Sequence, residues 1–194
     1  GSNNALLKPG FFFGIMLHMP EEKSTWGNEL WSIVRIIIIS LAIVLPIRYF
    51  IAQPFIVRGS SMEPNFADRE YLVIDEVSFF FREPRRGEAI VFRLPQGPHQ
   101  FLIKRVIGLP GETVLIKSGR VTVVNAREPA GRALEESYLD PSRAPTYPDM
   151  EVTLGPEDYF VMGDNRLASS DSRVWGWLPR NFIVGRAVFR AWPV

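Results

Sequence analysis

The sequence contains no cysteine and only two histidines, His18 and His99, among its 194 residues. Without cysteine there is no disulfide, no thiolate nucleophile and no cysteine-ligated zinc. His18 lies near the N-terminus, and His99 lies in a segment, PQGPHQ, that is typical of a loop, so we expect both to be solvated. A histidine-based triad or metal site therefore has almost no residues to draw on, and we expect neither a metal nor a cofactor.

The sequence also has no excess of charge of either sign. Its 22 Lys and Arg residues against 21 Asp and Glu residues give a net charge of +1, which argues against nucleic acid as a partner, because phosphate binding requires a concentrated basic surface. Hydrophobic residues make up 46% and charged residues 22%, so the composition is that of a folded chain. The length suits one domain with an appendage.

An apolar run, LWSIVRIIIISLAIVLPIRYFIAQPFIV, occupies residues 30–57. Only a serine and a proline interrupt the apolar residues between Arg35 and Arg48, and both arginines lie where their side chains can reach a membrane surface. The run contains about 22 residues up to residue 51, close to the roughly 20 that a bilayer core requires. We predict a transmembrane anchor over residues 30–52.

Two other interpretations of this run are a buried helix of a soluble protein and a cleaved signal peptide. The latter fits less well, because RYFIAQPF offers no pair of small residues for cleavage. Residues 1–29 are interpreted as an N-terminal arm whose opening Gly-Ser is typical of an expression-vector remnant. Its lysines and glutamates nearly balance, so charge indicates little about orientation in the membrane.

Short segments rich in β-branched and aromatic residues follow the anchor. They predict strands, and the segment before residue 124 predicts a hairpin about Ser118 and Gly119. Residues 125–150 contain four prolines and few apolar runs, which indicates an insertion or flap. The expected fold is mainly β, an antiparallel, partly open barrel-like domain of residues 53–124 and 151–194. The expected strands lie at 70–77, 88–94, 101–109, 112–124, 157–164 and 181–192.

The segment RGSSMEP, residues 58–64, is the first with residues suited to chemistry. Gly59 permits a sharp bend and Pro64 stops strand pairing, so a serine here can be raised out of a sheet. The segment is neither a G-x-S-x-G elbow nor an S-x-x-K motif. Taken alone it favours an ordinary turn, and Ser60 and Ser61 are equivalent.

Without cysteine or a usable histidine, a serine nucleophile needs a lysine or a carboxylate as its base. Lys104, in FLIKRVIGLPG, is predicted to lie on a strand with Leu102 and Val106 on the same face. An apolar environment penalises the charged ammonium and lowers its pKa, which would let lysine act as a base. The alternative is an edge-strand lysine whose amine reaches water.

The segment MGDNRLASSDSRVWGW, residues 162–177, gathers many hydrogen-bonding side chains beside two tryptophans. A hydrophilic loop is the simpler interpretation. Because the tryptophans would tether it, we expect a loop that orients neighbouring groups.

Together these segments resemble the bacterial type I signal peptidases, membrane-anchored serine proteases that remove signal peptides from exported proteins. The resemblance covers residues 30–194 and rests on three boxes in order: S-M-x-P at 61–64, K-R-V-I-G-L-P-G at 104–111, and G-D-N-R-x-x-S-x-D-S-R at 163–173. Related mitochondrial and plastid enzymes share these boxes, so the source is less well defined than the chemistry.

The resemblance implies a role for each matching residue. Ser61 is expected to be the nucleophile and Lys104 the general base, with Ser169 hydrogen-bonded to that lysine. Asp171 is expected to order the loop through Arg173, and Asp164 to pair with Arg105.

One departure from the family concerns the oxyanion hole, the group of donors that stabilises negative charge in the transition state. The position that often holds a second serine is Gly59, so backbone N–H groups near Gly59 and Ser61 would have to serve. A second departure, Asn65 in place of threonine, is expected to be tolerated in the turn.

The expected substrate is a secretory preprotein with small residues at the −1 and −3 positions, bound as an added strand. The resemblance also implies a site on the outer face of the bacterial inner membrane, and we expect a monomer. Other Ser/Lys proteases of the same broad fold and non-catalytic membrane-tethered peptide-binding modules remain alternatives. The expected walls of the substrate pockets are Phe55, Val57, Met62, Leu102 and Ile103.

Overall fold

The computed structural model describes residues 26–46, 53–140 and 146–192. The chain divides into two units, Gly1–Ile43 and Val44–Val194. The first contains most of helix α1 (Trp26–Pro46), and the second contains every strand.

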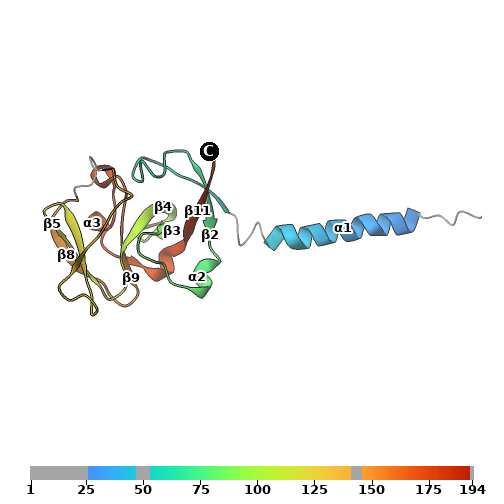
Figure 1. The fold of residues 1–194 in the computed structure, drawn as a ribbon. Helices are drawn as coiled ribbons and strands as arrows, with labels where there is room; N and C mark the ends of the chain where they lie inside the picture. The colour runs from blue at the N-terminus through green and yellow to red at the C-terminus, as the bar shows by residue number, and fades with distance from the viewer. Residues whose placement is uncertain (1–25, 47–52, 141–145, 193–194) are drawn as a thin grey trace, which may run out of the picture. The chain divides into compact units, whose positions relative to one another are not determined.

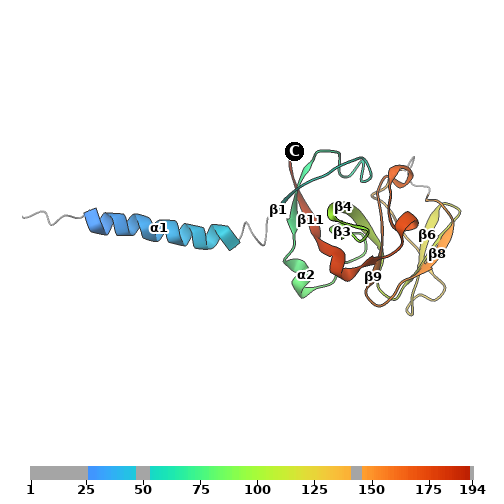
Figure 2. The same ribbon diagram turned by 180° about the vertical axis from the view of Figure 1, so that it is seen from behind.

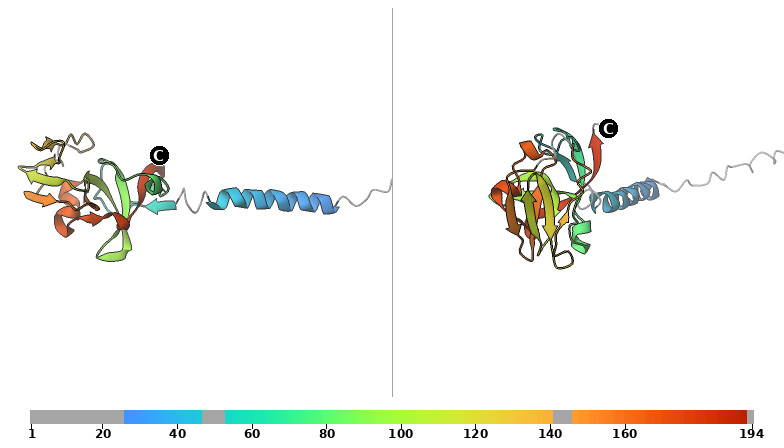
Figure 3. Two further views of the ribbon diagram at one scale, coloured as in Figure 1. Left: turned by 90° about the horizontal axis from the view of Figure 1, so that it is seen from below. Right: turned by 60° about the vertical axis from the view of Figure 1, so that its left-hand side comes forward.

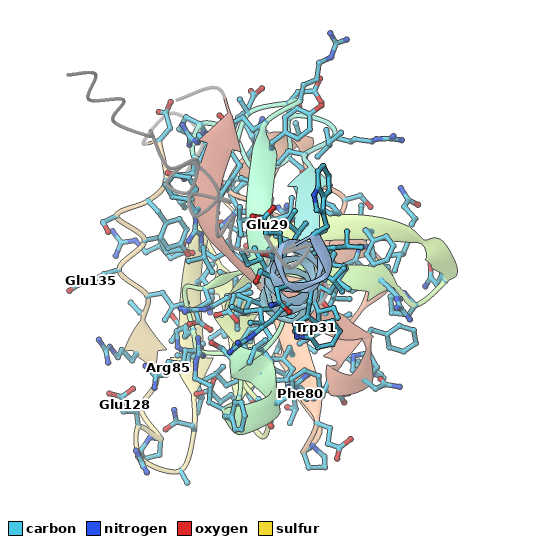
Figure 4. The ribbon with its side chains drawn as sticks, turned by 90° about the vertical axis from the view of Figure 1, so that its right-hand side faces the viewer. Glu29, Trp31, Phe80, Arg85, Glu128 and Glu135 are labelled. Atoms are coloured by element: carbon cyan, nitrogen blue, oxygen red, sulfur yellow. The ribbon has the colours of Figure 1, made fainter. Side chains whose placement is uncertain are left out.

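Helix α1 forms from 21 residues that are predominantly apolar (Figure 1). Glu29 in its first turn complements the positive end of the helix dipole, and Pro46 ends it because proline cannot donate the next hydrogen bond. At 1.5 Å per residue the helix is about 30 Å long, enough to cross a bilayer core. Trp31 and Glu29 project outward from it (Figure 4). The helix begins four residues before the expected anchor, whose last residues, 47–52, lie outside the described chain.

The strands of the second unit form two antiparallel sheets (Figures 1 and 2). The larger sheet has the order β1-β2-β11-β3-β4-β9-β10, so β11 lies between two strands from the first half of the unit. The smaller has the order β7-β6-β5-β8. The larger sheet consists of β1 (Gln53–Ile56), β2 (Tyr71–Asp75), β3 (Ala89–Leu94), β4 (Gly97–Gly108), β9 (Asp158–Met162), β10 (Leu178–Pro179) and β11 (Ile183–Trp192).

The smaller sheet is built around the expected hairpin, and Figure 3 shows its strands side by side. Ser118 and Gly119 form its two-residue turn with φ of 50° and 79°, the left-handed region that such hairpins require. Thr146 bridges to Gly119, so the segment expected as an insertion at 125–150 is part of a sheet that begins before residue 125. The strands are β5 (Thr113–Lys117), β6 (Arg120–Val124), β7 (Arg132–Ala133) and β8 (Met150–Thr153).

Short helical turns connect some of the strands. In α2, Phe79 is buried while Phe80 projects to the surface (Figure 4). These turns are α2 (Ser78–Phe81), η3 (Arg166–Ala168), α3 (Ser172–Trp175) and η4 (Arg180–Phe182).

The core consists of three clusters of buried side chains. One lies among β3, β4 and β9, and a second lies where the smaller sheet packs against β4 and β9. The third joins Val57 and Met62 to β2, β3 and β4. The expectation of a mainly β fold with one N-terminal apolar helix is confirmed.

One expected loop is wrong. His99 lies within β4 rather than in a loop, because β3 and β4 pair as far as Leu94 and Gly97, and only Pro95 and Gln96 turn between them.

Arg69 is the site of local backbone strain, since its φ is 67° and its side chain is exposed. A non-glycine residue there costs roughly 1 kcal/mol or more. We predict that Arg69→Gly raises the free energy of unfolding by about 1 kcal/mol in urea denaturation. Arg69→Ala, which retains a Cβ, should give no such gain; equal stabilisation by both variants would contradict strain as the cause.

Candidate active site

Ser61 lies in a loop that β1 and β2 close at its base. Val57 N–H donates to Glu70 O and Arg69 N–H donates to Val57 O, each at 2.9 Å. Met62, directly after the serine, is fully buried in the core beneath the loop. The loop therefore presents Ser61 beside an anchored side chain, with its Oγ toward β4.

Lys104 lies on β4 opposite Ile90 of β3, and only 3% of it is exposed. Its Nζ donates a hydrogen bond of 2.7 Å to Ser61 Oγ and one of 3.0 Å to Ile103 O. The alternative of an amine that reaches water is therefore wrong, because the side chain runs inward to the serine. The structure brings together the two residues that the sequence singled out.

Burial lowers the pKa of Lys104 from its ordinary value of 10.5 to about 8. The cause is desolvation, which disfavours the charged ammonium, while the negative charges of Asp171 and Asp164 act in the opposite direction. An amine with this pKa is neutral in a substantial fraction of molecules under mildly alkaline conditions. In that form it can accept the proton of a serine hydroxyl.

Two ion pairs order the loop of residues 162–175: one joins it to β4 and the other lies within the loop. Arg105 donates to both carboxylate oxygens of Asp164, at 2.7 and 2.5 Å. Arg173 pairs in the same two-pronged manner with Asp171, at 2.8 Å to each oxygen. Both pairings were expected, and both are present.

Asp171 connects the loop to its own backbone as well. It accepts from Gly163 N–H at 3.0 Å and caps α3 through the Arg173 N–H. Burial would raise the pKa of Asp171, but hydrogen bonding and the charge of Arg173 hold it below its ordinary value. The carboxylate therefore stays ionised close to Lys104.

Ser169 differs from the expectation. Its Oγ is buried, yet it has no hydrogen-bond partner among the residues that the structure describes, so the expected bond to Lys104 is absent. The Lys104 amine is directed at Ser61 Oγ and Ile103 O instead. Ser169 Oγ lies close enough to Asp171 to help lower its pKa, without a hydrogen bond of ordinary geometry.

Asn165 and Gly163 were not singled out from the sequence, although both lie in the third box. Asn165 donates from its backbone N–H to Ser61 O at 3.0 Å and from Nδ2 to Ser60 O at 3.2 Å. A Cβ on Gly163 would overlap both Ser61 O and the Ser169 side chain, so only glycine permits this close approach. The third box therefore contacts the backbone of the serine loop directly.

The expected oxyanion hole requires a correction at Gly59. Its N–H already donates to Asp68 Oδ1 at 2.7 Å, so it is not available to a substrate oxygen. With a φ of 85°, Gly59 directs its amide back across the loop to the carboxylate. Ser61 N–H has no acceptor within the described chain and remains available as a donor.

A groove of about 780 Å³ opens beside Ser61 and Lys104, between β1 and β4. Three of the five expected pocket residues line it: Phe55, Leu102 and Ile103. Val57 and Met62 do not, because both are buried in the core cluster under the loop. The other lining residues are Ile56, Arg58, Gly97, Gln100 and Phe101.

The geometry is that of a serine hydroxyl beside an amine that can lose its proton, at the side of an elongated groove. This pair can supply a nucleophile and its base without a metal. Within residues 26–46, 53–140 and 146–192, no three His, Asp or Glu side chains gather as metal ligands would.

Comparison with known proteins agrees with this chemistry. Residues 30–192 match the family described as signal peptidase, peptidase S26, and the chain therefore belongs to that family. Its relatives are signal peptidases I, so it is a serine endopeptidase, a hydrolase that removes signal peptides from preproteins. Helix α1 is long and apolar enough to be its membrane anchor.

Three relatives and one solved structure illustrate the similarity. Signal peptidase I of Leptolyngbya laminosa is 39% identical over 83% of this chain and 79% of its own length. A probable signal peptidase I-2 of Synechocystis is 36% identical, covering 93% and 82%, and signal peptidase I of Pseudomonas aeruginosa is 31% identical, covering 79% and 70%. A crystal structure of a signal peptidase I from Enterococcus faecalis is 29% identical, covers 55% of this chain and 98% of that one, and gives a TM-score of 0.46.

The buried amine has a consequence for stability. Because the pKa of Lys104 is lowered from 10.5 to about 8 by folding, the unfolded chain binds the proton more tightly between these values. Stability should therefore rise with pH across this interval, and at pH 7 the folded state carries the full penalty.

We predict that Lys104→Met raises the free energy of unfolding at pH 7 by on the order of 2 kcal/mol, because it replaces a buried ammonium with an apolar side chain of similar length. It should also remove the rise in stability between about pH 8 and 10.5, measured by urea unfolding at several pH values. Lys117→Met, at an exposed lysine of β5, is the control and should change neither. A loss of stability in Lys104→Met at pH 7 would contradict the desolvation argument.

Proposed function

We propose that this chain removes signal peptides through a Ser/Lys dyad in which Ser61 is the nucleophile and Lys104 is the general base. The observation that carries the proposal is the 2.7 Å hydrogen bond between Lys104 Nζ and Ser61 Oγ, made by a lysine that is only 3% exposed to solvent. Burying a lysine amine against a serine costs free energy of desolvation, and lysines with a pKa lowered in this way are typical of reaction centres.

In the proposed mechanism, neutral Lys104 accepts the proton of Ser61 while Oγ attacks the scissile carbonyl. The Ser61 N–H stabilises the negative charge on the carbonyl oxygen, and the protonated lysine then gives its proton to the leaving amine. An ester joins Ser61 to the signal peptide. Lys104 next takes a proton from water, which attacks the ester. The protonated lysine then returns that proton to Ser61 Oγ as the ester bond breaks, which frees the serine hydroxyl and the carboxyl group of the signal peptide.

The groove supports an extended peptide as substrate. β1 is an edge strand, and β4 pairs with β9 only from Arg105 onward, so both strands present unpaired backbone along the groove. A peptide lying there can add as a strand and place alternate side chains in the same direction. Phe55, Leu102 and Ile103 make the adjoining surface apolar, which favours small apolar residues at the −1 and −3 positions.

The finer localisation follows the same line. We propose that α1 anchors the protein in the bacterial inner membrane with the catalytic domain on the outer face, where translocated signal peptides emerge, and that a monomer is the active form.

Substitution tests the dyad directly. We predict that Ser61→Ala and Lys104→Ala each reduce cleavage of a preprotein by at least roughly 10³-fold, since each removes a group that takes part in bond formation. Ser60→Ala and Lys117→Ala, at exposed residues of the same types, are the matched controls and should retain activity. Loss of activity in Ser60→Ala with retention in Ser61→Ala would show that Ser60, and not Ser61, is the nucleophile.

The pH dependence tests the base. Because the neutral amine is the reactive form, kcat should rise with pH and reach half its maximum near the lowered pKa of about 8. The measurement is the initial rate of peptide cleavage at saturating substrate between pH 5 and 10, with circular dichroism to verify folding at each pH. A profile that is flat, or that falls through neutral pH, would identify a different base.

A further inference from the structure

The hydrogen bonds around Ser61 point to a role for Asn165 that goes beyond ordering its own loop. We infer that Asn165 is a positioning residue that orients the Ser61 N–H as the oxyanion donor. The inference rests on the proposed function, since it concerns the transition state of acyl transfer at Ser61.

Gly59 does not serve as an oxyanion donor in this structure. Its N–H is bound to Asp68 Oδ1 at 2.7 Å, a short hydrogen bond to a charged acceptor that competes with a substrate oxygen for the same amide. The charge on the substrate oxygen must then be stabilised chiefly by the Ser61 N–H. The direction of this one amide becomes correspondingly important.

The planarity of the peptide bond links the direction of the Ser61 N–H to that of the Ser60 C=O. The bond between Ser60 and Ser61 is trans, so the Ser60 C=O and the Ser61 N–H point in opposite directions. Asn165 Nδ2 donates to Ser60 O at 3.2 Å, and Glu63 N–H donates to the same oxygen at 3.2 Å. Fixing that oxygen directs the Ser61 N–H away from Asn165 and the 162–175 loop.

Asn165 makes a second contact with the backbone of the nucleophile. The Asn165 backbone N–H donates to Ser61 O at 3.0 Å, so one residue holds the carbonyl on each side of the nucleophile. The two peptide planes that meet at the Ser61 Cα are thereby both fixed. Since a carbonyl oxygen can only accept, the side chain at 165 must present a donor, which asparagine does and aspartate does not.

Asn165 is itself held firmly and in register with the base. It is 8% exposed, and its neighbour Asp164 pairs with Arg105, the residue directly after Lys104. The oxyanion donor and the general base are therefore positioned from the same short stretch of β4. If Asn165 only stabilised the loop, its substitution would not selectively weaken the binding of a ligand that needs the oxyanion donor.

The experiment measures kcat, KM and the affinity for a peptide aldehyde in Asn165→Ala and Asn165→Asp. The aldehyde peptide carries small residues at its −1 and −3 positions, and Ser61 adds to its carbonyl to give a tetrahedral adduct that needs the oxyanion donor. Both variants keep the backbone contact to Ser61 O, and aspartate keeps the volume of the side chain. Rates are compared on the alkaline plateau, which removes any change in the pKa of Lys104.

Removal of a complete oxyanion donor costs roughly 10²–10³ in kcat, so a misdirected one should cost about 10- to 100-fold. We predict this loss in kcat for both variants, with KM within about twofold of the unchanged protein. Affinity for the aldehyde should fall by the same factor, while affinity for the corresponding peptide alcohol stays constant. Asn181→Ala, at an exposed asparagine, is the control and should change none of these.

The possible failures are distinguishable. A rise in KM at constant kcat, or a fall in kcat without loss of aldehyde affinity, would overturn the role of Asn165 while leaving the dyad intact. If the unchanged protein binds the aldehyde no better than the alcohol, and Ser61→Ala does not alter this, then Ser61 is not the nucleophile and the proposed function fails together with the inference.

Discussion

The position of the Lys104 amine away from water is the constraint on which the rest of the site depends. An ammonium group in this place loses its hydration and gains only two acceptors, Ser61 Oγ and Ile103 O. The deficit is what lowers its pKa to about 8. In the arrangement of charges around it, Asp171 and Asp164 oppose this shift of the pKa but do not cancel it.

The two arginine pairs illustrate this arrangement. Asp171 and Asp164 both favour the charged form of Lys104, yet each carboxylate is bound through both of its oxygens by an arginine, Arg173 and Arg105. Each guanidinium group places a positive charge beside the carboxylate that it binds, which opposes the effect of that carboxylate on the lysine. Desolvation remains the largest effect on the pKa of Lys104.

The sequence predicted the parts of this structure that depend on local patterns and on residue types in fixed order. Alternating apolar residues located the long strands, and Ser118 with Gly119 located the hairpin. The boxes brought Ser61 and Lys104 to attention as a pair. The smaller sheet was recognised only in part, because β7 has two residues and Thr146 forms a single bridge, both too short to show a period.

The remaining errors share a physical cause. The Gly59–Asp68 and Asn165–Ser60 contacts join a side chain to a backbone group in another turn or loop, and no spacing in the sequence signals such a bond. The position of Met62 depends on how the turn after Ser61 closes over the core. Which apolar residues line a groove and which lie beneath it is decided by this closure.

The place of β11 has a consequence for the life of the protein before it reaches its substrate. This strand, residues 183–192, lies between β2 and β3, whose paired residues were made about 90 to 120 residues earlier. During synthesis, β2 and β3 therefore have no partner to join them until almost the whole described chain has left the ribosome. A nascent chain of this topology has no assembled active site with which to cleave the secretory chains around it, because β11 joins the two parts of the larger sheet last.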